Sequence, residues 1–316
     1  MADAGCREAD ILRHLCPVDS DISEHPGKQH VLRILDHFEI KGPNGTHQVL
    51  VTDVLLPLDS VREMGSKAPI NSKKTCYESV LGLSYLTHKG VVHGDLHTSN
   101  IAFSMPGLNA LTGEKVQSLL WTNCLPVVPR RLEEQSDSFP KYLIDRADFS
   151  ALVKHLSAKN GACDMLAVIT DFGQDDRLNS QYLAFGLSDP VPEPCTAESF
   201  PPPEAILQSE KNLKRWDFET RSKGDIWSMG CCIYEIFRGP ILFAIRGEDK
   251  KKLEHMGKIT TELREISDGI ETQPQPNSMR IPCDKALAGL LSQMLRMDAA
   301  ERQAAEILVQ NPWFDS

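Results

Sequence analysis

The stretch VVHGDLHTSN, residues 91–100, decides how the rest of this sequence is interpreted. It places Asp95 and Asn100 five positions apart, behind a short β-branched run and in a segment with few residues for a core to bury. A further carboxylate, Asp171, follows the short apolar run of MLAVITDFG (165–173). Two carboxylates and an amide after separate strands suit a hard cation such as Mg²⁺, which binds through one or two carboxylates plus substrate phosphates.

That set of side chains points to phosphoryl transfer, in which a protein mainly positions groups and neutralises charge. Asp95 fits the group that orients the attacking hydroxyl, and Asn100 and Asp171 fit the metal ligands. The plainer interpretation is that HGDLHTSN caps a helix and that DFG is a turn after a strand. Each plain interpretation is credible alone, but the occurrence of both motifs in this order favours the chemical one.

Composition sets the class of protein. With 316 residues, 41% apolar and 25% charged, the chain is expected to be globular and soluble. The net charge of −10 disfavours direct binding of nucleic acid and favours basic peptides as partners. The nine cysteines lack metal or disulfide spacing, which predicts reduced thiols in a cytoplasmic or nuclear protein. The N-terminus does not read as a signal peptide, and no run approaches about 18 apolar residues, so we expect no membrane association.

Hydrophobic periodicity predicts alternating helices and strands along most of the chain. The expected helices lie at about 9–15, 73–90, 224–237, 285–297 and 299–310, and the expected strands at 30–40, 47–55 and 165–171. Asn44-Gly45 supplies a tight turn between the first two strands. Residues 104–163 show no sustained period, and we interpret them as an insertion that is partly loop.

Taken together, these motifs resemble those of the eukaryotic protein kinases over nearly all of the chain except the insertion. HGDLHTSN is similar to their catalytic loop, ITDFG to their metal-binding motif, FPPPE to the end of their activation segment, and GDIWSMGCCIYEI to their central buried helix. The resemblance implies an α+β, bilobal, protein-kinase-like fold. Residues 1–55 would form a truncated, β-rich N-lobe, and residues 56–316 a largely α-helical C-lobe with the insertion at about 104–163.

The resemblance also implies ATP and Mg²⁺ as cofactors and assigns roles to individual residues. It implies catalytic roles for Asp95, Asn100 and His97, metal binding by Asn100 and Asp171, and ATP binding by Asp53, Val54, Leu55, Ala102 and Glu8. The backbone from Asp53 to Leu55 would meet adenine.

Several structural roles come with the same resemblance. Arg302 would pair with Glu204, and Asp225 would hold the backbone of the catalytic loop. An apolar column of Leu12, Ile34, His93 and Phe172 would join the two lobes.

Within the kinases, the chain is most similar to the fungal SR-protein-kinase-like (CMGC-type) enzymes. That likeness rests on HFEIKGPNGTHQVLVTDVL, on PPEAIL, on FPKYLI and on the 71 positions between Asn100 and Asp171. It implies serine or threonine substrates in basic Arg/Ser-rich protein segments.

Three positions depart from the family pattern. Gly94 stands where an arginine would receive an activation-loop phosphate, so we expect activity not to need that phosphate. His97 replaces a lysine and carries only part of a charge at neutral pH. Ala197 replaces a threonine, for which Thr196 or Ser199 is a neighbouring substitute. The last two changes weaken contacts to the γ-phosphate.

The family places a glycine-rich loop and a strand lysine before the helix that bears Glu8, and only seven residues precede Glu8 here. We therefore expect a truncated kinase, and the remaining hairpin should expose an apolar face. A catalytically impaired pseudokinase that scaffolds a basic partner is the non-enzymatic alternative. A small-molecule phosphotransferase also shares HGDLHxxN, although PPE, DIWSMG and Arg302 argue against it.

Overall fold

The structure is a computed structural model, and it describes most of the chain. The described residues are 4–17, 25–43, 45–64, 70–128, 140–160, 165–172, 201–211, 217–239, 241–243, 248–270 and 283–315.

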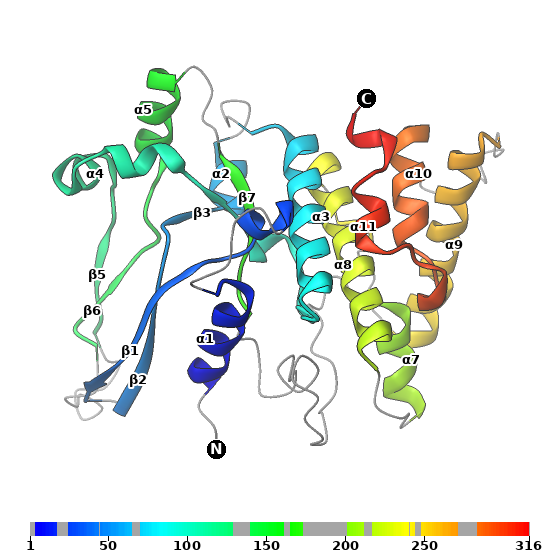
Figure 1. Ribbon diagram of the computed structural model, residues 1–316, viewed down its shortest axis with the longest axis horizontal. Coiled ribbons are helices and arrows are strands. Elements are labelled where there is room, and N and C mark those ends of the chain that lie inside the picture. The colour runs from blue at the N-terminus through cyan, green and yellow to red at the C-terminus, as the bar shows by residue number, and fades with distance from the viewer. Residues whose placement is uncertain are drawn as a thin grey trace.

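The α-helices are α1 (Ala4–Leu15), α2 (Leu58–Glu63), α3 (Ser72–His88), α4 (Gly113–Leu119), α5 (Ser150–Asn160), α7 (Pro203–Lys211), α8 (Phe218–Arg238), α9 (Asp249–Asp268), α10 (Lys285–Met294) and α11 (Ala305–Leu308). Short 3₁₀ helices are η2 (Pro26–His30), η4 (Thr98–Asn100), η5 (Pro106–Ala110), η7 (Ala299–Glu301) and η8 (Pro312–Phe314). The helices α3, α7, α8, α9, α10 and α11 gather on the right of Figure 1, and the strands lie to their left together with α1, α2, α4 and α5. This arrangement confirms the predicted α+β, protein-kinase-like fold.

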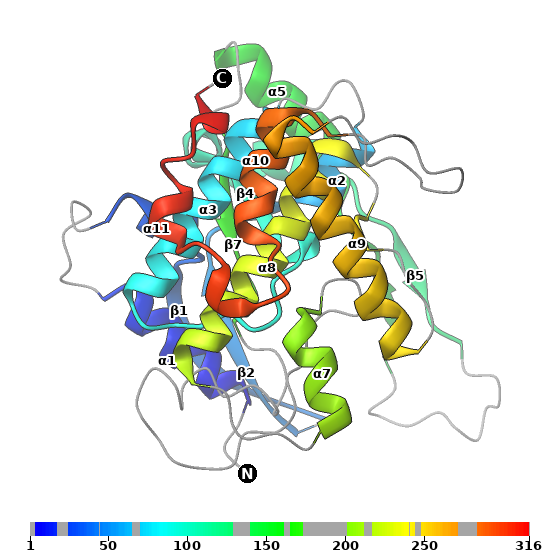
Figure 2. The ribbon, with the colours of Figure 1, turned by 90° about the vertical axis from the view of Figure 1, so that its right-hand side faces the viewer.

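Helix α8 is the centre of the helical part. It is buried along most of its length, as its all-round apolar sequence predicted. The Asp217 carboxylate accepts the Thr220 N–H (2.8 Å) at its first turn, and Gly239 (φ 95°) ends it. Trp227 stacks on Phe243 inside the core (5.1 Å between ring centroids). In Figure 2, α10 lies over α8, with α9 beside it.

The strands form three small sheets. They are β1 (Ile34–Gly42) with β2 (Gly45–Thr52), then β3 (Leu55–Pro57), β4 (Ile101–Ser104) and β7 (Leu166–Ile169) in that order, and β5 (Cys124–Pro126) with β6 (Tyr142–Ile144). The strands within each sheet pair antiparallel, and an isolated parallel bridge joins Val31 to Ile169 of β7. The middle sheet matters most for function, because β4 starts where the loop 91–100 ends and β7 leads to Asp171.

The β1–β2 hairpin confirms the predicted pair of strands, although β1 begins only at Ile34 and Asn44 of the turn lies outside the described residues. Phe38 and Ile40 are 45% and 50% exposed on β1. The prediction of an exposed apolar face on this hairpin is therefore confirmed.

The last predicted helix, 299–310, was wrong as a single element. Residues Ala299–Glu301 form η7, Arg302 is extended (φ −72°, ψ 134°), and a helix resumes only at α11. Arg302 leaves the helical path because its buried side chain turns inward to the partly exposed carboxylate of Glu204. A specific polar contact thus overrides the local helical pattern.

Candidate active site

The loop 91–100 is held in place by the buried helix α8. Asp225 of α8 accepts the His93 N–H at Oδ2 (2.7 Å) and the Gly94 N–H at Oδ1 (2.9 Å). Gly94 has φ 79°, a left-handed conformation that glycine adopts at little cost. Burial raises the pKa of the Asp225 carboxyl, while His93 and the two backbone donors act in the opposite direction. These bonds agree with the role that the resemblance implied for Asp225.

Asp95 and Asn100 are connected across this loop. The Asn100 Nδ2–H donates to the Asp95 carbonyl (3.0 Å), and both residues are buried. Because the nitrogen is used in this bond, the amide oxygen is the atom that Asn100 offers to a cation. His97 Nδ1 accepts the Ser99 N–H (3.3 Å), and its Nε2 lies 3.9 Å from Asp95 Oδ2.

Asp171 is brought to the same region by the pairing of β4 with β7. Thr170, which follows β7, donates its N–H to the Asn100 carbonyl (2.9 Å). Asp171 has φ 65°, a left-handed conformation that is rare for residues other than glycine and that clusters at functional sites. The sheet thus gathers Asp95, Asn100 and Asp171 around the first residue of β4, Ile101.

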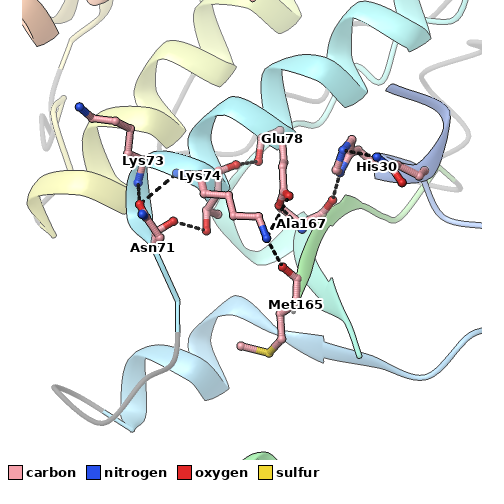
Figure 3. Close-up of polar contacts among 10 residues, drawn as sticks. His30, Asn71, Lys73, Lys74, Glu78, Met165 and Ala167 are labelled. Atoms are coloured by element: carbon pink, nitrogen blue, oxygen red, sulfur yellow. Dashed lines mark hydrogen bonds and ion pairs between the residues drawn. The ribbon is translucent and has the colours of Figure 1, made fainter. Parts of the chain in front are cut away.

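The other edge of β7 is bound by side chains. Glu78 of α3 accepts the Ala167 N–H (2.8 Å), and the His30 Nδ1–H donates to the Ala167 carbonyl (2.8 Å). Lys74 lies 3.6 Å from Glu78 and donates to the Met165 carbonyl (3.4 Å). Figure 3 shows these side chains reaching β7 from α3 and η2. Since the backbone groups of an edge strand need partners, this network fixes the strand that leads into the carboxylate site.

Glu8 of α1 approaches the same strand end. Its Oε1 accepts the Phe172 N–H (3.3 Å). Burial, followed by the charge of Asp171, raises the pKa of the Glu8 carboxyl. Both effects disfavour an ionised Glu8 at this place.

The members of the predicted apolar column lie in or against one core. Leu12 and Phe172 are buried in it, and Ile34 packs against it. The rings of His93 and Phe172 are 5.1 Å apart, and the His93 Nε2–H donates to the Thr170 carbonyl (2.9 Å). The column therefore touches the loop through His93 and the Asp171 strand through Phe172.

The residues predicted to meet adenine lie between β2 and the middle sheet. Asp53 accepts two hydrogen bonds from the Arg33 guanidinium (3.1 Å each), Val54 is exposed, and Leu55 begins β3. Ala102 is buried in the neighbouring strand β4. The side chain of Asp53 is engaged with Arg33, and its carbonyl accepts the Thr52 Oγ1–H (3.2 Å) with one lone pair left for a further donor.

Arg302 and Glu204 form a buried ion pair that ties α7 to the segment after α10. Arg302 Nη1 and Nη2 donate to the two Glu204 carboxylate oxygens (2.6 and 2.5 Å). The pair predicted from the resemblance is confirmed. The other residues predicted around the activation segment, Gly173, Thr196, Ala197 and Ser199, lie outside the described residues.

Sequence reasoning missed the polar residues that support the loop and β7 from behind. These are Glu78 and His30 behind β7, and Glu235 of α8 with Arg62 behind the loop. One signal was available: Glu235 stands in a helix whose other residues are mostly apolar, and a carboxylate in such a place needs a partner.

The described residues hold no group of three or more His, Cys, Asp or Glu side chains arranged for a metal ion. A Mg²⁺ site needs fewer protein ligands, because the ion keeps waters and uses substrate phosphates. Within the described part of the chain, no helix has the length and apolar run that a membrane span requires.

Comparison with known proteins gives consistent matches. The protein kinase domain family matches residues 157–314. Protein kinase dsk1 of Schizosaccharomyces pombe is 21% identical over 79% of this chain and 57% of its own length. The serine/threonine-protein kinase SKY1 of Saccharomyces cerevisiae is 33% identical over 30% of this chain and 13% of its own. The chain therefore spans about half of dsk1 and a smaller part of SKY1.

A solved crystal structure of a kinase domain superposes with a TM-score of 0.55, covering 98% of this chain and 83% of that domain at 17% identity. At this identity the likeness supports the fold.

Proposed function

The chain belongs to the protein kinase family, and on that basis we propose that it transfers the γ-phosphate of ATP to a serine or threonine hydroxyl of a protein. The observation that carries the proposal is that Asp95, Asn100 and Asp171 lie around the start of β4. A relative whose name is serine/threonine-protein kinase SKY1 supports the choice of hydroxyl.

In this reaction Asp95 accepts a hydrogen bond from the substrate hydroxyl and orients its oxygen toward the γ-phosphorus. The hydroxyl oxygen forms the new O–P bond, Asp95 takes the proton, and ADP leaves with the electrons of the broken bond. His97, 3.9 Å from Asp95, faces the same carboxylate.

The donor set fits Mg²⁺, since Asp171 offers a carboxylate and Asn100 an amide oxygen, both hard ligands. When bound, the ion would neutralise charge on the transferred phosphate. The backbone from Asp53 to Leu55, with Ala102, would hold adenine, and Glu8 would border the phosphates. We assign residues 1–55 to the upper lobe and 56–316 to the lower lobe, with the insertion at about 104–163.

Basic, Arg/Ser-rich protein segments are the proposed substrates. The net charge of −10 and the likeness to fungal SR-protein-kinase-like enzymes support this choice. A cytoplasmic or nuclear location follows from the same likeness.

The test uses the purified chain, Mg²⁺, ATP labelled at the γ-phosphate and a peptide of alternating Arg and Ser. We expect label on the peptide serines, and Asp95→Asn should lower the rate by at least about 100-fold. Asp268→Asn, an equal change at the exposed end of α9, is the control and should keep the rate. Full activity of Asp95→Asn would remove the assignment of the base.

A scaffold without catalysis is the second candidate, and Glu8 favours it. The Glu8 Oε1 accepts the Phe172 N–H (3.3 Å), so this carboxylate is already engaged where a lysine–ATP contact would need it. In a scaffold, no label would transfer to the peptide. The Arg302–Glu204 pair argues against the third candidate, a small-molecule phosphotransferase. That candidate would instead label an aminoglycoside or choline.

A further inference from the structure

Glu235, in the last part of α8, contacts two other segments, the loop 91–100 and α2. Its Oε2 accepts the Thr98 Oγ1–H of the loop 91–100 (3.2 Å). Its Oε1 accepts the Arg62 Nη1–H of α2 (2.7 Å), and its own carbonyl accepts the Arg62 Nη2–H (2.9 Å). One buried carboxylate thus joins three elements.

We propose that Glu235 is a positioning residue that acts through the Thr98 hydroxyl to hold Asn100 in the place where it binds the Mg²⁺–nucleotide complex. This inference rests on the proposed function, and it adds a residue that touches neither the substrate nor the ion.

The loop has two anchors on α8, one at each end. Asp225 binds the backbone of its first half at His93 and Gly94. Glu235 stands ten residues further along the same helix, about 15 Å at a rise of 1.5 Å per residue, and binds the second half at Thr98. Without the second anchor, the half of the loop that carries Asn100 would lose this hydrogen bond to α8.

The second half of the loop has little stiffness of its own. Thr98 opens η4, a 3₁₀ helix of only three residues that ends at Asn100. Short 3₁₀ segments have poor hydrogen-bond geometry and do not persist without outside support. Because Asn100 is two residues from Thr98, a shift of the Thr98 backbone strains the two bonds that orient Asn100, from its Nδ2–H to the Asp95 carbonyl and from the Thr170 N–H to its own carbonyl.

Both partners of the Thr98–Glu235 hydrogen bond are buried, so loss of the bond would be costly. Thr98 is 6% exposed and Glu235 is 9% exposed, so removal of Glu235 would leave the Thr98 hydroxyl buried without this acceptor, and removal of the hydroxyl would leave the Glu235 carboxylate with Arg62 but without the Thr98 bond. A buried carboxylate with charged and hydroxyl partners is weak evidence for stability, but it fixes geometry well.

Through Arg62, Glu235 is also connected to the stretch that is proposed to bind adenine. Arg62 lies on α2, which begins directly after β3, the strand that starts at Leu55. Glu235 therefore connects the stretch proposed to meet adenine with the loop that bears the metal ligand.

The experiment compares Thr98→Val, which removes only the hydroxyl at nearly constant shape, with Thr98→Ser, which keeps it. Thr260→Val is the matched control, because Thr260 is 7% exposed and donates to a backbone carbonyl (3.1 Å) on α9, outside this contact. For each protein we would measure the Mg²⁺ concentration that half-saturates binding of a fluorescent ATP analogue, kcat and KM for the peptide, and amide exchange of residues 93–101 without ligand.

Thr98→Val should raise the half-saturating Mg²⁺ concentration about tenfold and lower kcat by a similar factor, with the peptide KM unchanged. Its loop amides should exchange faster than those of the wild type. Thr98→Ser should restore each value, and Glu235→Gln should shift them in the direction of Thr98→Val. Unchanged Mg²⁺ dependence and unchanged exchange in Thr98→Val, or an equal shift in Thr260→Val, would overturn the inference.

The two proposals fail in different ways. If the wild type neither binds the ATP analogue nor transfers phosphate, the proposed function fails, and with it the part of this inference that concerns Mg²⁺. Amide exchange without ligand then still decides whether the Thr98–Glu235 contact holds the loop.

Discussion

Replacement of Arg302 by methionine should destabilise the fold more than any surface change, because Arg302 is among the most buried charged residues described. It is 1% exposed, and besides Glu204 its guanidinium donates to the carbonyls of Arg296 (3.0 Å) and Lys223 (2.8 Å). The guanidinium also lies over the Trp227 ring (5.2 Å). Arg302→Met keeps most of the volume and the contact with the ring but removes every donor.

The expected loss of unfolding free energy depends on the groups that Arg302→Met leaves without a partner. Removal of one partner of a buried ion pair costs about 3–5 kcal/mol, because the other charge is left unpaired. The Glu204 side chain is 16% exposed, so water reaches it in part, and we expect the lower end, about 3 kcal/mol. Two carbonyls also lose their donors. Against a total stability of about 5–15 kcal/mol for a typical domain, this is a large fraction.

Urea unfolding followed by tryptophan fluorescence measures this loss in Arg302→Met, in Glu204→Gln and in the double variant. Once Arg302 is gone, the further change Glu204→Gln should cost little or even restore stability, since it removes the unpaired charge. A loss below about 1 kcal/mol in Arg302→Met, or additive losses in the double variant, would refute the reasoning.

Two further predictions concern the packing and titration of residues around α3 and η2. Gly82→Ala should lower the free energy of unfolding by about 1–3 kcal/mol, because a Cβ there would lie 2.7 Å from the His30 carbonyl oxygen. Gly257→Ala, with no atom within 4 Å of the added Cβ, is the helical control and should raise the free energy of unfolding by about 1 kcal/mol. Urea unfolding measures both variants, and a change of the same sign in both would contradict the packing argument. His25 Nδ1 accepts the Gly27 N–H (3.0 Å), and burial lowers the pKa of His25. The stability from His25 is thus present above its ordinary pKa, about 6.5, and lost as pH falls through the lowered value, whereas His25→Asn keeps an acceptor without titrating. The free energy of unfolding, measured by urea unfolding across pH 5–8, should therefore fall more steeply toward low pH in the wild type than in His25→Asn. Parallel pH dependences of the two proteins would exclude this role of His25.

The sequence predicted those features that depend on short motifs. Asp95, Asn100 and Asp171 were proposed as site residues from their types and order, and the pairing of β4 with β7 brings Asn100 and the strand that leads to Asp171 together. The buried helix was predicted from its apolar residues on every side. Asp225 and Arg302 followed from the family resemblance, which supplies long-range partners that periodicity alone does not give.

The features that were missed depend on partners far apart in the chain. Glu78 meets Ala167 across 89 positions, and Glu235 meets Thr98 across 137. No local pattern specifies such pairs, because they arise only when the elements pack. The broken helix at Arg302 has the same origin, since the ion pair of the buried Arg302 with Glu204 outweighs a helix propensity worth a fraction of a kcal/mol per residue.

The anchors on α8 bear on the expectation drawn from Gly94. Where the family has an arginine that is fixed by a phosphate on the activation segment, this chain has a glycine at φ 79°. In that conformation the Gly94 N–H donates to Asp225, so the loop is bound to a helix in the core. The loop therefore does not depend on a phosphate of the activation segment for its position. With Glu235 holding Thr98 at the other end, both halves of the loop are fixed by residues of one rigid element. The loop geometry should therefore be present before any phosphorylation, which agrees with constitutive activity and equally with a rigid, inactive scaffold. Phosphate transfer from ATP to a peptide by the unphosphorylated chain is what separates these two functions.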